Sequence, residues 1–279
     1  KGAVKTFAAD CLMPDGRVLQ IASTHYLGQN FSKAFEIMYL DSDGKRKHVY
    51  QTCYGPGIWR ILAAVISIHG DNNGLVLPFE IAPIQVVVIP IPSKETKDVV
   101  EEYSRTVVGM LRSAGLRVEA DFSDKTPGAK YYYWEMMGVP VRVEVGPREV
   151  EGKYVTLFRR DTRKRVKASL EEMVEAVKTL GDDILENLRK RAERFMNSMV
   201  FKAENMEQVR SLSKKGGFIV VPFCSIDYDG EECGLRLKQE LGLEVRGVPL
   251  KNRVKPPDDA KCIVCGRKAG EYVYLGKAY

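Results

Sequence analysis

One apolar run constrains the fold of this 279-residue chain more than any other feature. In residues 84–91 only Gln85 and Pro90 interrupt large aliphatic side chains, which is typical of a strand covered on both faces. Apolar side chains then recur at helical spacing across residues 99–111, and residues 117–122 return to strand character. The order strand, helix, strand predicts a βαβ unit and therefore an α/β domain.

The region before this run is richer in short strands. The Pro-Asp-Gly turn at residues 14–16 predicts a hairpin, because these residue types favour tight turns between strands. A second turn at residues 41–44 precedes a predicted strand at 49–54, a glycine turn and a buried helix at 61–68. The first region is therefore expected to be a separate, sheet-based domain.

The rest of the chain alternates strands and helices. Strands are predicted at residues 141–145 and 154–158. Ser169 and Glu172 have the spacing of a capping box and should open a long helix, which Gly181 is expected to bend or break. The last region is predicted to be a compact α/β unit with a helix at 206–212, a strand at 218–221 and a helix at 235–241.

These patterns predict three domains, at residues 1–82, 83–190 and 191–279, in a chain of mixed α/β and α+β class. The length agrees, because 279 residues exceed the usual size of one domain. The chain starts without methionine and leads straight into patterned sequence, so we expect it to be a fragment of a longer protein.

The composition limits the classes of function. Lys and Arg number 43 against 37 acidic residues, and this net charge of +6 permits nucleic-acid binding without demanding it. No apolar run approaches eighteen residues and no signal-peptide pattern is found, so neither membrane insertion nor secretion is indicated. The reducing cytoplasm is the expected compartment.

Four of the six cysteines gather near the end of the chain. Cys262 and Cys265 form a Cys-x-x-Cys knuckle, which presents two thiolates to one tetrahedral metal ion, and Zn²⁺ is its natural occupant. Cys224 and Cys233 supply a second, more widely spaced pair; free buried thiols are the alternative. Four protein ligands leave no open position, so the predicted zinc site is structural.

Two groups of residues are candidates for binding a small ligand. In residues 55–60, Gly57 permits close backbone approach and Arg60 starts an apolar helix, where a phosphate group can be bound. On these residues alone, a tight turn with a surface arginine is the favoured alternative. Gln20, Ser23 and His25 form a polar group able to line a pocket, and a satisfied polar strand is equally compatible with them.

Basic and polar residues in the middle of the chain favour RNA binding. The basic segment at residues 153–167 suits contact with phosphates, although such runs are also typical of solvated surfaces. Glu135, Arg142 and Arg148 offer a carboxylate and two guanidinium groups that suit hydrogen bonds to unpaired bases. An ordinary ion pair between Glu135 and Arg142 is the alternative.

Longer segments resemble the archaeal/eukaryotic-type prolyl-tRNA synthetase family, in order and across essentially the whole chain. They are residues 12–17 (LMPDGR), 23–31 (STHYLGQNF), 69–71 (HGD), 74–78 (GLVLP), 82–87 (APIQVV), 138–148 (GVPVRVEVGPR), 158–161 (FRRD) and 276–279 (GKAY). This resemblance implies a class II aminoacyl-tRNA synthetase that forms prolyl-adenylate from proline and ATP with Mg²⁺. It also implies transfer of proline to proline tRNA, commonly by a homodimer.

The resemblance assigns a fold and roles to particular residues. It implies the end of an antiparallel-sheet class II catalytic domain, then an α/β anticodon-binding domain and a small zinc-binding α/β domain. Arg60 matches the motif 3 arginine that braces the ATP phosphates, where a planar fork offsets developing charge. The positions that match the proline and adenylate pocket are Gln20, Ser23, His25 and Gly57.

Glu135, Arg142 and Arg148 match the family's anticodon-reading positions. Proline anticodons share guanines at their second and third positions, and guanine offers donors that suit a carboxylate and acceptors that suit a guanidinium. The resemblance also implies that the carboxylate of Tyr279 reaches toward the active site.

Two class II motifs are not found in this sequence: motif 1, which builds the dimer interface, and the motif 2 arginine, which binds the ATP α-phosphate. The chain by itself is therefore expected to be inactive. A truncated synthetase is the favoured interpretation. A non-catalytic zinc-containing tRNA-binding module and an unrelated zinc-containing RNA-binding module are the alternatives.

Overall fold

A computed structural model describes residues 2–279 and divides the chain into two compact units. The first unit comprises Lys1–Ala64 and Phe195–Tyr279, and the second is Val65–Arg194. The chain passes from one unit to the other inside helix α2 (Ile58–His69) and returns inside helix α6 (Met173–Ser198). Within residues 2–279, no helix is both long enough and apolar enough to cross a membrane.

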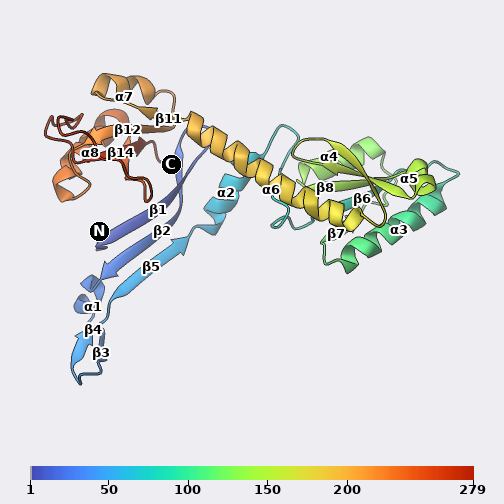
Figure 1. Cartoon of the computed structure of the whole chain (residues 1–279), viewed down its shortest axis with the longest axis horizontal. Helices are drawn as coiled ribbons and strands as arrows, with labels where there is room; N and C mark the ends of the chain where they lie inside the picture. Colours follow the sequence, from blue (N-terminus) through green and yellow to red (C-terminus); the bar gives the residue numbers. More distant parts are fainter. Residues whose placement is uncertain (1) are drawn as a thin grey trace. The chain divides into compact units, whose positions relative to one another are not determined.

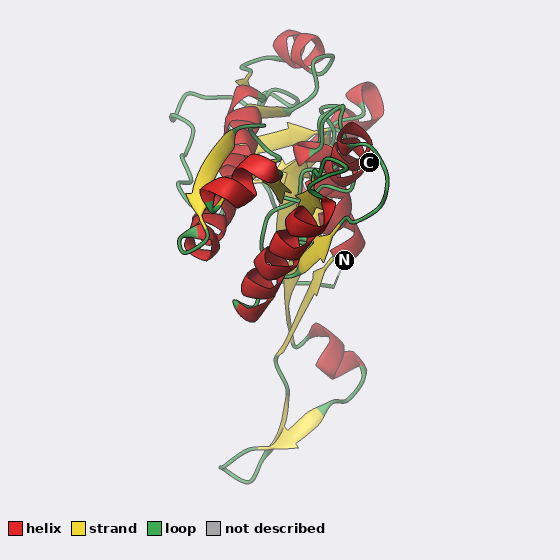
Figure 2. Ribbon diagram, turned by 90° about the vertical axis from the view of Figure 1, so that its right-hand side faces the viewer, coloured by secondary structure: helices red, strands yellow, loops and turns green. Residues whose placement is uncertain are grey.

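The amino-terminal part of the first unit is built on a three-stranded antiparallel sheet (Figure 1). Its strands, in spatial order, are β1 (Lys5–Leu12), β2 (Val18–Gly28) and β5 (Gln51–Pro56). The hairpin expected around residues 14–16 is confirmed, with Gly16 in the positive-φ conformation that its turn requires. Beyond the sheet lie α1 (Asn30–Ala34) and an extended hairpin of β3 (Met38–Leu40) and β4 (Arg46–His48), which Figure 2 also shows.

The carboxy-terminal part of the first unit is the predicted α/β unit. Its four-stranded sheet has the order β11 (Val200–Lys202), β12 (Phe218–Phe223), β14 (Glu271–Gly276) and β13 (Glu244–Gly247). The helical elements are α7 (Met206–Leu212), the 3₁₀ helix η1 (Tyr228–Gly230) and α8 (Glu231–Leu241). Ile219, Val221 and Leu237 lie in its buried core, so the sheet and α8 pack on one another.

The β1–β2 hairpin packs against this carboxy-terminal part. Leu12, Val18 and Phe218 form a small buried cluster. Main-chain hydrogen bonds connect the same regions, from Val18 N to Lys277 O at 2.7 Å and from Gly217 N to Gly16 O at 2.8 Å. Residues some 200 positions apart in the sequence are thereby held in one packed unit.

The second unit contains a five-stranded mixed sheet, in which β6 pairs parallel to β7 and β8 while the other pairs are antiparallel. The spatial order is β10 (Arg165–Ser169), β9 (Tyr154–Arg159), β8 (Val141–Val145), β6 (Val86–Pro90) and β7 (Val118–Ala120). The helices are α3 (Lys97–Ser113), α4 (Pro127–Met136), α5 (Pro147–Gly152) and most of α6.

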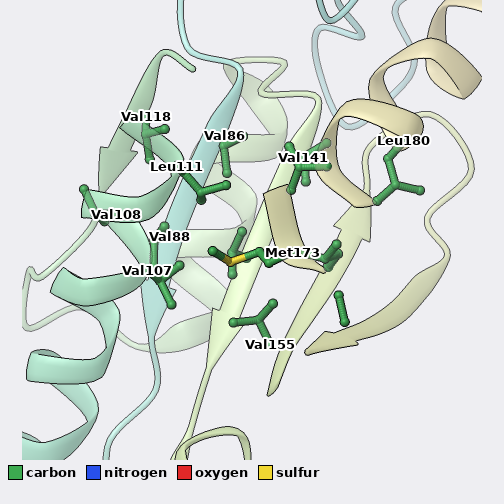
Figure 3. Close-up of a cluster of buried hydrophobic side chains, with 14 of the residues drawn as sticks. Val86, Val88, Val107, Val108, Leu111, Val118, Val141, Val155, Met173 and Leu180 are labelled. Atoms are coloured by element: carbon green, nitrogen blue, oxygen red, sulfur yellow. The ribbon is translucent and has the colours of Figure 1, made fainter. Parts of the chain in front are cut away.

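The apolar run at residues 84–91 is confirmed as a buried strand, β6. All five residues of β6 are buried, and α3 connects it to β7 as the predicted βαβ unit. Figure 3 shows Val86 and Val88 together with Val107 of α3 and Met173 of α6 in the main hydrophobic core. Burial of these side chains supplies the main stabilisation of the unit.

Two expectations are wrong. The helix predicted at 61–68 is present within α2, but it is not a buried helix, because Ala64 is its only buried residue. Gly181 does not break α6, which continues from Met173 to Ser198. A Cβ at Gly181 would lie 2.5 Å from the Phe79 ring, so this glycine permits close packing.

Candidate functional site

A bulge in β2 brings the predicted pocket residues onto one face of the sheet. On β1, Thr6, Ala8 and Asp10 share a face because successive side chains alternate. Their partners on β2 are His25, Ser23 and Gln20, because Ile21 is an extra residue between the paired positions. A regular strand would place Gln20 on the opposite face from the other two.

On this face Ser23 and His25 are half-buried, Thr6 is exposed, and the three side chains form one hydrogen-bonded chain. His25 is linked by its ring nitrogens to Thr6 Oγ1 at 2.9 Å and to Ser23 Oγ at 3.1 Å. The satisfied polar strand that sequence alone allowed is therefore present. Gln20, Ser23 and His25 are only partly buried, so some of their polar surface remains exposed.

The main chain at the same bulge holds the start of α2. Gly57 N donates to Ile21 O at 2.7 Å, and Arg60 NH1 donates to Gln20 O at 3.1 Å. A Cβ at Gly57 would lie 3.1 Å from Ile21 O, so a larger residue would crowd this contact. The structure therefore brings together Gly57, Arg60 and Gln20, and Arg60 remains exposed beside an open depression lined by residues 56–60.

In the second unit, Arg142 lies at the centre of a buried ionic network. Its NH1 donates to Glu135 at 2.9 Å and its NH2 to Glu144 at 2.8 Å. The guanidinium is stacked between the rings of Tyr131 and Phe158, 3.8 and 3.9 Å from their centroids. The Glu135–Arg142 ion pair, considered from sequence as the alternative to base reading, is present.

The second carboxylate oxygen of Glu135 is less well occupied. Oε2 is buried and accepts no hydrogen bond, although Arg163 NH2 lies 3.3 Å away as an ion-pair partner. Arg148 lies in α5 and is exposed, and among the described residues it joins neither Glu135 nor Arg142 in an ion pair. The structure thus brings Glu135 and Arg142 together and leaves Arg148 free for an outside partner.

A second arginine fixes the main chain at Glu135. Arg160 is 1% exposed and donates to both carboxylate oxygens of Asp71, at 2.7 and 2.6 Å, while its Nε donates to Glu135 O at 3.1 Å. The hydrogen bonds from Arg160 lower the pKa of Asp71 to about 2. Sequence reasoning missed this pair, because nothing local connects positions 71 and 160.

The four clustered cysteines converge on one point of the first unit. Their sulfur atoms all lie within 4.8 Å of one another, and Cys224 Sγ is 3.7 Å from Cys233 Sγ. Four sulfurs around a zinc ion at about 2.3 Å would lie about 3.8 Å apart, so the donor set fits a tetrahedral metal ion. Cys224 follows β12, Cys233 lies in α8, and Cys262 and Cys265 lie in the loop before β14.

Arg267 adds positive charge beside these thiols. Its Nε lies 3.4 Å from Cys265 Sγ, its NH2 3.6 Å from Cys224 Sγ, and NH2 also donates to Asp229 O at 2.9 Å. Burial acts to raise the pKa of Cys265, but the hydrogen bonds from Arg267 outweigh it and lower that pKa to about 6. The thiolate form that metal ions bind is therefore favoured at Cys265, whereas burial raises the pKa of Cys224 and of Cys233.

Comparisons with known proteins extend over the whole chain. The chain is 50% identical over 281 aligned residues to a protein of Thermofilum pendens named "Proline--tRNA ligase", and 44% identical to one of the same name from Pyrococcus abyssi. Each alignment covers 100% of this chain and 57% of the relative. A solved structure, "Giardia lamblia Prolyl-tRNA synthetase in complex with prolyl-adenylate", matches with a TM-score of 0.92 and 35% identity, over 100% of this chain and 59% of that one.

Family descriptions match three successive segments. They are "tRNA synthetase class II core domain (G, H, P, S and T)" at residues 2–69, "Anticodon binding domain" at 85–180, and "Prolyl-tRNA synthetase, C-terminal" at 206–279. The chain belongs to the prolyl-tRNA synthetase family. It spans a little over half the length of the curated relatives it matches.

The family segments separate the sites found above. The bulge with Gly57 and Arg60 lies in the class II core segment, the Glu135–Arg142 network in the anticodon-binding segment, and the cysteine cluster in the carboxy-terminal segment of prolyl-tRNA synthetases. Sequence reasoning missed Arg246, which contacts Asp10 and Gln20 in the structure. No local pattern marks a contact between residues 236 positions apart.

Proposed function

We propose that this chain is the part of a prolyl-tRNA synthetase that completes the proline and ATP site, binds the anticodon and holds a structural zinc ion. The whole protein would activate proline with ATP and Mg²⁺ to prolyl-adenylate and transfer it to proline tRNA. The observation that carries this proposal is the continuous 50% identity over the full chain to a protein named for that reaction.

For the catalytic segment, Arg60 is proposed to brace the ATP phosphates. It is exposed in the first turn of α2, where main-chain N–H groups also favour an anion. A guanidinium there can offset charge that develops during attack on the α-phosphate. Gln20, Ser23 and His25 would line the proline and adenylate pocket on one sheet face, and Gly57 would keep the main chain close to it.

For the anticodon-binding segment, Glu135 and Arg148 are proposed to contact guanine bases. Glu135 has one buried carboxylate oxygen without a hydrogen bond, which can accept from guanine N–H groups once the half-exposed Arg163 beside it moves aside. Exposed Arg148 can donate to guanine acceptors. Arg142 is buried and already paired on both sides. Its proposed contribution is to hold Glu135 in position, with any base contact limited to its remaining N–H groups.

The cysteine cluster is proposed to bind Zn²⁺ through Cys224, Cys233, Cys262 and Cys265. A tetrahedral set of four thiolates is typical of structural zinc, and the ion would stabilise the carboxy-terminal sheet from which the ligands come. Thiolate ligands require a reducing environment, which supports a cytoplasmic location. A homodimer is part of the same proposal, since the family resemblance implies one.

The proposal is tested by proline-dependent exchange of pyrophosphate into ATP and by charging of proline tRNA. A synthetase of full family length that contains this segment should perform both reactions. The 279-residue chain should bind proline tRNA and perform neither, because motif 2 is not found in its sequence. Exchange driven equally by other amino acids would contradict the assigned substrate. Failure of the chain to bind tRNA would contradict the assignment of the anticodon-binding segment.

A further inference from the structure

Two β-bulges meet in the first unit. In β13 the pairing with β14 shifts between Val245 and Gly247, which leaves Arg246 as the extra residue. In β2 the extra residue is Ile21. A bulge changes the direction of the side chain at the extra residue. Here the Arg246 side chain points toward the β1–β2 hairpin and contacts it beside the second bulge.

Arg246 makes a bidentate contact with the hairpin. Its Nε and NH2 donate to the two carboxylate oxygens of Asp10 at 2.8 and 2.9 Å, and NH2 also lies 3.4 Å from Gln20 Oε1. The side chains of Arg246 and Asp10 are each only 13% exposed. Glu244 holds the guanidinium from its other side, with Oε2 at 3.1 Å from NH1. A largely buried, bidentate guanidinium–carboxylate pair of this kind is both strong and directional.

The bulge that Arg246 contacts is the same one that holds the catalytic segment. Gln20 is the residue paired with Asp10, and its carbonyl accepts from Arg60. The next carbonyl, of Ile21, accepts from the Gly57 amide. Two successive carbonyl groups of the bulged strand thus set the position of the turn that begins α2.

We propose that Arg246 is a positioning residue for the candidate active site. Through Asp10 and Gln20 it fixes the β2 bulge, and the bulge in turn fixes Gly57 and Arg60. A strand without this anchor can relax toward regular pairing, and that one-residue slip would move the Gln20 side chain to the other face. The catalytic role of Arg246 rests on the proposed function of the site. The structural coupling between Arg246 and Gly57 does not, and it can be measured without any activity.

The coupling is measured on the 279-residue chain by hydrogen exchange at the Gly57 amide, whose acceptor is Ile21 O. In Arg246→Ala we expect exchange at this amide to become about tenfold faster, the factor that matches the loss of one charge-assisted hydrogen bond. Arg246→Lys keeps the positive charge but lacks the bidentate guanidinium, so its Gly57 amide should exchange at a rate between those of the unaltered chain and Arg246→Ala. Asp10→Asn should resemble Arg246→Ala, and the double variant should add little more.

Two controls separate positioning from general loss of stability. Arg210→Ala removes another arginine–carboxylate pair of the same carboxy-terminal part, with Glu240, and should leave Gly57 exchange unchanged. The Val221 amide in β12 reports on opening of the carboxy-terminal sheet. Unchanged Gly57 exchange in Arg246→Ala, or an equal acceleration at Val221, would overturn the proposal.

The activity arm uses a synthetase of full family length that contains this segment. There Arg246→Ala should lower kcat of proline-dependent pyrophosphate exchange about tenfold, with a smaller change in the KM for ATP, because the position of Arg60 matters most in the transition state. A normal kcat in this variant would overturn the catalytic consequence. Absence of exchange in the unaltered protein would instead reject the proposed function, while the Gly57 measurement would still decide the coupling.

Discussion

Replacing Arg142 by alanine should destabilise the second unit strongly. The Arg142 guanidinium pairs with two carboxylates, of Glu135 and Glu144, and is stacked between two aromatic rings with 4% of its side chain exposed. Alanine would remove the cation and leave both carboxylates inside the protein, where they are poorly hydrated. Removing one partner of a buried ion pair is more costly than the pair is stabilising, because the remaining charge has no compensation.

The size of the effect follows from what remains around each carboxylate. Breaking a buried pair costs about 3–5 kcal/mol. Arg163 stays near Glu135 and Arg165 near Glu144, but both of these arginines are half-exposed. Because these arginines still pair with the two carboxylates, we expect the free energy of unfolding to fall by about 3 kcal/mol, the lower end of that range, with the lost ring contacts included. That is a large fraction of the stability of an ordinary domain.

The chain offers a local probe for this measurement. It has two tryptophans, and Trp134 is adjacent to Glu135, with its indole N–H donating to Asp121 at 2.9 Å. In a Trp59→Phe background, urea unfolding followed by Trp134 fluorescence reports on the second unit alone. Arg189→Ala, which removes exposed ion pairs from α6, is the matched control and should change nothing measurable. If Arg142→Ala lowers the free energy of unfolding by less than about 1 kcal/mol, the reasoning is refuted, because so small an effect is typical of a solvent-exposed ion pair.

Four further outcomes are expected. Arg60→Ala should lower kcat of pyrophosphate exchange in the full-length synthetase by about a hundredfold, and an unchanged rate would reject its assignment to the phosphates. Elemental analysis of protein purified without chelator should find about one zinc per chain; its absence would reject the cysteine site. Arg160 lowers the pKa of Asp71 from its ordinary value of 3.8 to about 2, so the pair stabilises the fold fully above pH 3.8 and loses this contribution as the pH falls toward 2. Asp71→Asn should therefore remove this pH dependence from the free energy of urea unfolding. Arg148→Ala should weaken recognition of cognate tRNA by about 1–3 kcal/mol while proline-dependent exchange persists, and an unchanged preference on guanine-substituted tRNA would exclude a base contact.

The features predicted correctly from sequence are those determined by neighbouring residues. The βαβ unit follows from the apolar run of β6 and the helical spacing of α3, and the β1–β2 hairpin follows from its turn. The Cys262–Cys265 knuckle is likewise a local motif, and the structure places its two sulfur atoms close to those of Cys224 and Cys233. In each case the periodicity or spacing itself encodes the structure.

Helix α4 was not predicted, although signals for it were available. Thr126 accepts from Ala129 N as an N-cap, Pro127 occupies the first turn, and Gly138 adopts positive φ after the helix ends. The run of aromatic residues 131–134 has strand-like propensity and obscured these signals. Tertiary packing decides here, since Tyr131 and Trp134 pack against buried residues of the sheet.

The bulge at Ile21 was beyond the reach of sequence reasoning. Nothing in the composition of residues 18–28 distinguishes a bulged strand from a regular one, and its anchor, Arg246, comes from the other end of the chain. Yet the bulge decides whether Gln20 shares a face with Ser23 and His25. Residue type and resemblance point to Gln20, Ser23 and His25 as pocket residues, but the bulge that places them on one face is held by a long-range contact.

The contacts that hold Glu135 in place determine how anticodon recognition has to be tested. Glu135 is held by Arg142 at its side chain and by Arg160 at its main-chain carbonyl, so its position depends on both arginines. A loss of tRNA recognition in Arg142→Ala would therefore combine a displaced carboxylate with a destabilised unit. Glu135→Gln keeps the size of the side chain and removes its charge, and Arg148→Ala alters an exposed residue. A loss of guanine preference in these two variants, with stability unchanged, can be assigned to the bases themselves.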